Sequence, residues 1–261
     1  MRYTKGYPSL WRRVPLCIYF CGKMKLVSTR KITFSIDEFY HLYNRGVEKR
    51  TIFLDIDDYQ RFLELLFVVN TTKPIDMRLI HKYEDSIFDF DRGNQLVAIG
   101  AYCLMPNHFH ILLTPLVDDG VSKFMGKLCT SYSMYFNKKY KRTGALFQGM
   151  FKAQWANNDE YLKYLYSYIH LNPVKLIDPI WKEKGIKNSE VAFTYASSYQ
   201  YSSLSDYLGA IRQISGILTP TLFPDYFSTH LNIRKELLEW INFQLPIDQE
   251  SQTLKSGFKQ N

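Results

Sequence analysis

Two histidines separated by one residue, His108-Phe109-His110, are the strongest chemical signal in this sequence. On a β-strand, residues i and i+2 share one face, so both imidazoles would point one way and Phe109 the other. Two imidazoles on a rigid strand form half of a site for a divalent metal. The alternative is one exposed histidine and one hydrogen-bonded in the core. The sequence contains no HExxH motif and no Cys/His zinc set, so zinc hydrolysis is not indicated.

A second candidate group lies in the tyrosine-rich segment 159–172. Tyr168 and Asn172 are spaced i and i+4, which places them on one face of a helix. At that spacing the amide oxygen could ligate a metal while the phenol oxygen acts as a nucleophile. The alternative is an aromatic core face with hydroxyls at its rim. His170, two residues past Tyr168, should face elsewhere.

Strands and helices alternate along the chain in an order that would position these groups. The expected elements are a strand over 32–47, a helix over 53–70 capped by Asp57 or Asp58, a strand pair over 96–115, a helix over 122–140, an aromatic strand within 138–152, and a helix over 159–172 capped by Asn158. This order suggests an α+β sandwich, with helices packed on one face of an antiparallel sheet.

The regions outside these elements have different compositions. Segment 70–94 is polar and irregular and is interpreted as an insertion. Segment 178–209 is rich in Ser and Tyr and looks loop-like, and an amphipathic helix follows near 229–243. We therefore expect an extension over 1–31 that is disordered or not translated (Met24 is an alternative start), a main folded domain over 32–176, a loop and helix extension over 177–246, and a disordered tail over 247–261.

Composition narrows the partners. The chain has 261 residues, 33 Lys+Arg against 25 Asp+Glu, a net charge of +8, and 16% aromatic residues. A basic balance favours polyanions, and aromatic side chains among basic ones suit stacking on unpaired bases. No segment supplies the ~20 continuous apolar residues of a membrane span, so no membrane partner is expected. The cysteines at 17, 21, 103 and 129 show no CxxC spacing, which favours a reducing cytoplasm.

Over residues 32–209 the chain resembles the REP-associated tyrosine transposases, relatives of the small single-tyrosine HUH transposases. The segments that carry the resemblance are YHLYNRG (40–46), YCLMPNHFHILL (102–113), YFNKKYKRTGALFQGMFKA (135–153), YLKYLYSYIHLNPVK (161–175) and YSSLSDYLG (201–209). LMPNHxH followed by YIHLNPVK is highly specific. One departure is Met150, because family members commonly have Arg after FQG.

The resemblance implies a ferredoxin-like α+β core and an enzyme that uses Mg²⁺ or Mn²⁺. Such an enzyme cleaves and rejoins single-stranded or hairpin DNA with palindromic repeats through a 5′-phosphotyrosine, as a monomer or homodimer, in the cytoplasm at the nucleoid. His108 and His110 match the metal-binding HUH histidines, and Tyr168 matches the catalytic tyrosine. Asn172 falls where the family carries an amide ligand on a helix.

Basic and polar residues near these motifs are candidate DNA contacts. They are Asn44, Arg45, Lys49, Arg50, Lys138, Lys139, Lys141, Arg142, Gln148 and Lys152. The alternative for any single lysine is a solvated surface charge. Two other functions stay open: a domesticated protein that binds DNA hairpins with little or no turnover, for which Met150 would be one sign, and a metal-binding structural domain.

Overall fold

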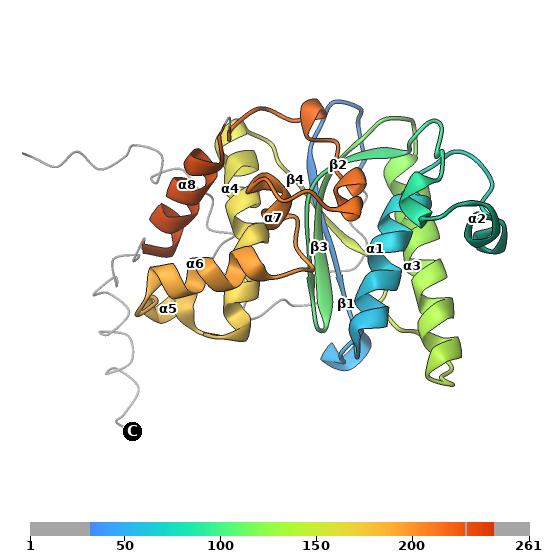
Figure 1. Cartoon of the computed structure of the whole chain (residues 1–261), viewed down its shortest axis with the longest axis horizontal. Coiled ribbons are helices and arrows are strands. Elements are labelled where there is room, and N and C mark those ends of the chain that lie inside the picture. The colour runs from blue at the N-terminus through green and yellow to red at the C-terminus, as the bar shows by residue number, and fades with distance from the viewer. Residues whose placement is uncertain (1–31, 228, 243–261) are drawn as a thin grey trace, which may run out of the picture.

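The computed structural model describes residues 32–227 and 229–242, and within them four strands form one antiparallel sheet. The strands are β1 (Tyr40–Arg45), β2 (Val97–Met105), β3 (His108–Pro115) and β4 (Lys152–Trp155), in the spatial order β2-β3-β1-β4. Helix α1 (Ile56–Val68), the longest of the helices between β1 and β2, and helix α3 (Gly120–Lys139) between β3 and β4 are the two crossover helices of the sheet (Figure 1). This βαββαβ order confirms the predicted ferredoxin-like α+β class.

Helices make up most of the remaining described chain. The α-helices are α1 (Ile56–Val68), α2 (Met77–Tyr83), α3 (Gly120–Lys139), α4 (Asp159–His170), α5 (Trp181–Lys184), α6 (Ser189–Ser198), α7 (Leu204–Tyr207) and α8 (His230–Asn242). The 3-10 helices are η3 (Val47–Lys49), η4 (Ile87–Asp89), η5 (Asn172–Leu176), η6 (Gln213–Ile217) and η7 (Pro220–Leu222). No helix in the described part of the chain is long and apolar enough to cross a membrane.

Helices α1 and α3 cover one face of the sheet. Phe62 and Leu66 of α1 and Phe124 of α3 pack with Phe109 and Ile111 of β3 in the main apolar core. The period-two alternation of β3 produces this contact, because it sends Phe109 and Ile111 to the face opposite His108 and His110. Helix α1 begins after Asp55, whose side chain accepts a hydrogen bond from the Asp58 backbone N–H at 3.1 Å. The predicted cap at Asp57 or Asp58 is therefore wrong by two or three residues.

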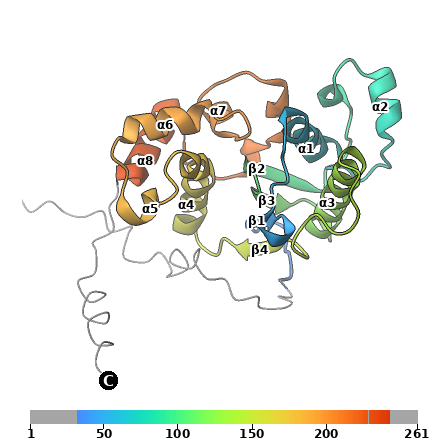
Figure 2. The same cartoon turned by 90° about the horizontal axis from the view of Figure 1, so that it is seen from below.

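Helix α4 covers the opposite face, so the expectation that helices pack on one face holds only for α1 and α3. Figure 2 shows α4 across the sheet from α1 and α3. Its residues Leu162 and Leu165 pack on Ala98 and Ala101 of β2. Gly100 between these alanines lies at a bulge, and a Cβ there would come within 2.8 Å of the Tyr166 hydroxyl. Small residues on β2 thus allow α4 to approach the sheet closely. Local sequence patterns do not reveal this second helical layer, because the contact joins distant segments of the chain.

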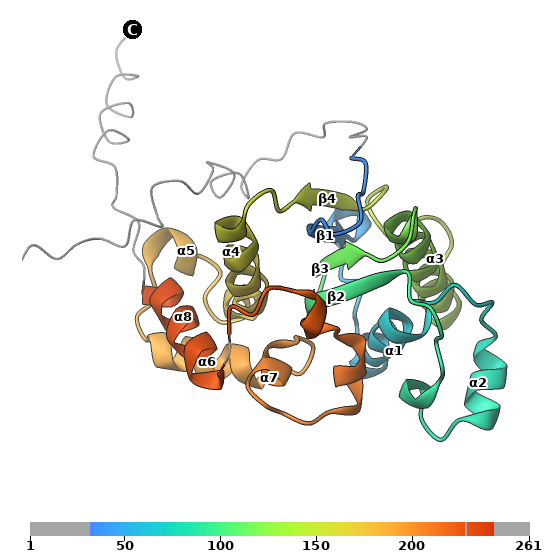
Figure 3. The ribbon, with the colours of Figure 1, turned by 90° about the horizontal axis from the view of Figure 1, so that it is seen from above.

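The C-terminal extension is more helical than its composition suggests. Helix α6 lies within the segment 178–209 expected to be loop-like, because Asn188 caps it and its apolar side has a partner. Phe193 and Ala196 pack against Leu237 of α8, and Figure 3 shows α6 and α8 side by side beyond α4. An ion pair of 2.8 Å between Lys163 and Glu236 joins α4 to α8.

Some domain boundaries stay predictions. The segments 1–31 and 247–261 lie outside the described residues. The expected insertion at 70–94 contains the short helices α2 and η4, and the expected helix near 229–243 is present as α8. The expected aromatic strand within 138–152 is displaced toward the C-terminus, since β4 begins at Lys152.

Candidate active site

The two predicted histidines share the face of the sheet on which α4 packs. In the β1–β3 register, Arg45 lies opposite His108 and Tyr43 lies opposite His110. Residues directly opposite each other on antiparallel strands point to the same face. His41, two residues before Tyr43, therefore also points to this face and lies close to the pair.

Each imidazole is oriented by a hydrogen bond. Nδ1 of His108 lies 2.6 Å from Oδ1 of Asn107, which accepts its proton. Nδ1 of His110 lies 2.8 Å from Nε2 of His41, and both side chains are about 95% buried. When Nδ1 of each ring is engaged in this way, Nε2 remains the nitrogen that would ligate a metal.

All three imidazoles are held in the neutral form that metal binding requires. Burial lowers the pKa of His41 and of His108 to about 3 from an ordinary value of 6.5. Burial, with further contributions from His108 and His41, lowers the pKa of His110 well below its ordinary value. Neutral rings at neutral pH need no deprotonation before they bind a cation.

Tyr168 of α4 lies directly against the histidines. Its ring centroid is 5.5 Å from that of His110 and 5.7 Å from that of His41, both in edge contacts. Helix α4 starts where predicted, because Asn158 accepts a hydrogen bond of 2.7 Å from the Tyr161 backbone N–H. The apolar side of α4 packs on β2 and leaves Tyr168 half-buried at the edge of that contact.

Asn172 follows α4 at the start of η5 and is fully buried. Its Nδ2 donates a hydrogen bond of 2.8 Å to the Tyr168 carbonyl, which turns the amide back toward α4. Its Oδ1 is buried without a hydrogen-bond partner. A buried orphan oxygen costs about 1–3 kcal/mol, and a cation would satisfy it. His170, by contrast, faces away as expected and pairs with the Ser203 hydroxyl at 2.8 Å.

These groups fit a divalent metal by their chemistry. Within the described residues no set of three or more His, Cys, Asp or Glu side chains is gathered in a metal-binding arrangement. The donors that would hold Mg²⁺ or Mn²⁺ are instead the imidazoles of His108 and His110 and the orphan oxygen of Asn172. Three protein donors leave coordination positions open, as in catalytic metal sites.

Six of the ten predicted DNA contacts are exposed around one edge of this face. They are Arg45, Lys49, Lys138, Lys141, Gln148 and Lys152. Lys152 pairs with Tyr43 across β1 and β4 and so lies on the same face as the histidines. Figure 1 shows that the β2–β3 turn, the start of α1 and the end of α3 meet at this edge. Met150, where the family commonly has arginine, is 75% exposed beside them.

The other four predicted contacts are occupied by the protein itself. Asn44 is buried and donates to the Gly149 carbonyl at 3.3 Å, and Arg50 pairs with Glu48 at 3.8 Å. Arg142 donates to the Asn137 side chain at 2.7 Å. Lys139 forms ion pairs with three carboxylates at the start of α1: Asp55 at 2.7 Å, Asp57 at 3.7 Å and Asp58 at 3.0 Å.

Sequence reasoning missed three groups near the site: His41, Lys182 and Lys175. His41 belongs to the YHLYNRG segment, but only the pairing of β1 with β3 reveals that it reaches His110. Lys182 lies beyond the motifs, and its Nζ is 4.1 Å from the centre of the Tyr168 ring. The Lys175 Nζ, within the YIHLNPVK motif, is 5.8 Å from that centre. The sequence signal for Lys175 is its positive charge two residues after Pro173, which does not by itself indicate a contact with Tyr168.

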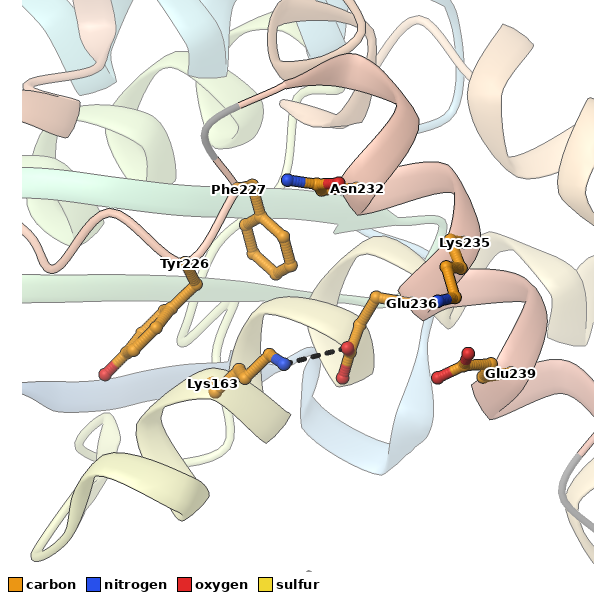
Figure 4. Close-up of a pocket in the computed structure, with 7 residues that line it drawn as sticks. All are labelled: Lys163, Tyr226, Phe227, Asn232, Lys235, Glu236 and Glu239. Carbon is orange, nitrogen blue, oxygen red and sulfur yellow. Dashed lines mark ion pairs between the residues drawn. The ribbon is translucent and has the colours of Figure 1, made fainter. Parts of the chain in front are cut away.

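A separate hollow lies between α4 and α8 (Figure 4). Its volume is about 210 Å³, and its lining includes Lys163, Lys235, Glu236 and Glu239. Because Lys163 and Glu236 pair with each other, charges of both signs are satisfied there. Such a lining does not select a polyanion.

Comparisons with known proteins found a matching family model and similar solved structures. The family model described as “Transposase IS200 like” matches residues 63–172, a range that holds His108, His110, Tyr168 and Asn172. No curated protein matches the chain. A solved structure of a REP-associated tyrosine transposase bound to a REP hairpin is similar at 14% identity and a TM-score of 0.44, covering 85% of this chain and 94% of that one. Over residues 63–172 the chain is therefore similar to the IS200-like transposases.

Proposed function

We propose that this protein is a metal-dependent DNA transposase that cleaves and rejoins single-stranded or hairpin DNA through a 5′-phosphotyrosine at Tyr168. The observation that carries the proposal is the position of Tyr168, in edge contact with His110 and joined through its carbonyl to Asn172. Tyr168 thereby lies against a neutral imidazole, and the residue with the orphan amide oxygen, Asn172, is joined to its backbone, which supports the proposal. The family match over 63–172 supports the same reading.

The cleavage step transfers a phosphoryl group to the protein. The phenol oxygen of Tyr168 attacks the scissile phosphorus, and the bond from phosphorus to the 3′ oxygen of the departing strand breaks. One proton leaves the phenol and one is taken up by the 3′ oxygen, so the products are a 5′-phosphotyrosine and a 3′-OH. The 3′-OH of a second strand reverses the step, and no ATP is needed because the phosphodiester energy is retained.

The chain's own residues would hold the cation and the nucleophile. His108, His110 and Asn172 would bind Mg²⁺ or Mn²⁺, and the bound ion would polarise the scissile phosphate and stabilise the departing oxygen. His41 holds the His110 ring in place through their hydrogen bond of 2.8 Å. The exposed cations at the neighbouring edge, Arg45, Lys138, Lys141 and Lys152 among them, would bind the backbone of the strand.

The site is assembled within one chain, which supports action by a monomer. His110 and Tyr168 come from β3 and α4 of the same chain and are in contact. In a dimer with shared sites, an inactive His110→Ala chain mixed with an inactive Tyr168→Phe chain would regain cleavage, because one composite site would be intact. We expect no recovery in the mixture, and recovered activity would establish a shared site. As a DNA-processing enzyme, the protein would act in the cytoplasm at the nucleoid.

The test is cleavage of a labelled single-stranded DNA that carries a palindromic hairpin. We expect cleavage with Mn²⁺ or Mg²⁺, none with EDTA, and a protein–DNA adduct that survives denaturation. The candidate substrates are the inverted repeats that flank or surround the coding sequence. Tight hairpin binding with no cleavage in Mn²⁺ would instead identify a domesticated binding protein. Absence of any salt-sensitive DNA binding would point to a structural metal-binding domain.

A further inference from the structure

Beyond the family match, the chain folds back toward the candidate nucleophile. Residues after Asn172 form η5, and α5 follows at Trp181–Lys184. Trp181 is 6% exposed and is held in an apolar cluster with Val174, Phe193 and Leu237. This cluster is built by η5, α6 and α8, so the C-terminal extension fixes the position of α5.

Anchoring of Trp181 places the next residue against Tyr168. The Lys182 Nζ lies 4.1 Å from the centre of the Tyr168 ring and 5.4 Å from that of Trp181. Its charge also acts on His110, where it helps to disfavour the protonated ring. Lys175 is farther from the Tyr168 ring, at 5.8 Å. Two cations from the segment beyond α4 therefore approach the same phenol, and Lys182 approaches more closely.

We propose that Lys182 is a positioning residue for Tyr168, supplied by the C-terminal extension from outside the matched domain at 63–172. This inference rests on the proposed function of Tyr168. An ammonium over the face of a phenol ring is attracted by the ring quadrupole and fixes the ring's orientation. The same ammonium lies beside the phenol to which the phosphoryl group would become attached, and its positive charge would stabilise the negative charge that develops there.

The consequence is that the matched domain is incomplete without the extension. Without α5, the Tyr168 ring would lose its nearest described cation. The effect should therefore appear in the chemical step and not in DNA affinity, because Lys182 is half-buried against the protein while the exposed basic edge binds the strand.

The experiment compares Lys182→Met with Lys182→Arg and with Lys184→Met in the full chain. Lys184 is exposed on the same short helix and serves as the matched control. Single-turnover formation of the covalent adduct is followed at saturating hairpin DNA, together with hairpin affinity and the thermal unfolding midpoint. We expect Lys182→Met to slow adduct formation about tenfold or more with unchanged hairpin affinity. Lys182→Arg should retain most of the rate, and Lys184→Met should match the unsubstituted protein.

Failures of the inference and of the proposed function are distinguishable. If the unsubstituted protein forms the adduct and Lys182→Met forms it equally fast, Lys182 has no positioning role and the proposed function stands. If the unsubstituted protein forms no adduct with any hairpin DNA, the proposed function of Tyr168 and the positioning role of Lys182 are both contradicted. Should Lys182→Met unfold, Lys182→Gln is the second variant, and a normal rate in either folded variant overturns the inference.

Discussion

Two clusters in this molecule each bring a lysine to a tyrosine, and they differ in their surroundings. At the end of α3, the Lys139 Nζ and the Tyr140 hydroxyl both bind Asp58, at 3.0 and 2.8 Å, and Asp58 is fully buried. At the end of α4, Tyr168 lies against Lys182 and the ring of His110. The first cluster neutralises its lysine with carboxylates, whereas the second surrounds its phenol with cations and neutral imidazoles.

The difference indicates what each cluster does. In the α3 cluster, the Lys139 side chain satisfies a buried carboxylate that would otherwise be costly, so the interaction joins α3 to the start of α1. The hydrogen bond from Lys139 also lowers the pKa of Asp55, which keeps that carboxylate ionised. In the α4 cluster, Lys182 lies over the Tyr168 ring beside the neutral imidazole of His110, an arrangement that suits the proposed attack on a phosphate. A lysine beside a tyrosine thus indicates chemistry only once its acidic neighbours are known.

Removing each phenol hydroxyl is the change with the largest expected contrast. Tyr168→Phe should lower the cleavage rate by at least about 1,000-fold, because no other group supplies the attacking oxygen. Tyr140→Phe should leave the rate near normal and lower stability by about 1 kcal/mol, since one hydrogen bond to Asp58 is lost. Cleavage assays and urea unfolding separate the two effects. Equal loss of cleavage in both variants would contradict the assignment of Tyr168 as the nucleophile and of Tyr140 as a structural residue.

The hydrogen bond between His41 and His110 should control metal affinity. His41→Leu is expected to weaken Mn²⁺ binding by about 10–100-fold, as loss of a partner that orients a metal ligand typically does. His41→Gln retains an acceptor for the His110 N–H and should recover much of the affinity. Isothermal titration with Mn²⁺ alone, without DNA, measures this directly. Unchanged affinity in His41→Leu would mean that His110 needs no such partner.

Neighbouring lysines at the end of α3 should behave differently. Lys139→Met is expected to lower the free energy of unfolding by about 1–3 kcal/mol, since buried Asp58 loses a charged partner. Lys138→Met, at an exposed position, should cost little stability but weaken DNA binding and reduce the slope of log affinity against log salt by about 0.7–0.9. If Lys139→Met weakened DNA binding and Lys138→Met lowered stability instead, Lys139 would be the DNA contact and Lys138 the residue that stabilises the fold.

Local signals in the sequence were sufficient for much of the fold. Asn158 caps α4 as predicted, and the alternation of β3 separates His108 and His110 from Phe109 as predicted. These features depend on residues within a few positions of one another. The second helical layer on the sheet depends instead on Ala98 and Gly100 lying under α4, which is a contact between distant segments.

Parts of the site escaped the sequence for the same reason. His41 and His110 are 69 positions apart, and Lys139 and Asp58 are 81 apart. No periodicity or motif encodes such pairings, so the sequence does not reveal His41 and does not distinguish Lys139 from the basic residues around it. Asn44 stays a predicted DNA contact, although its strand position places it on the face opposite the histidines.

Mapping the covalent adduct tests the central claim most directly. The protein is incubated with hairpin DNA and Mn²⁺, the DNA is digested, and the peptide spanning 159–175 is sequenced by mass spectrometry. Helix α4 carries Tyr161, Tyr164 and Tyr166 as internal controls, since all three are buried in its packed face. The phosphodiester-linked nucleotide is predicted on Tyr168 alone. A nucleotide on any other tyrosine, or cleavage that leaves none on the protein, would contradict the account.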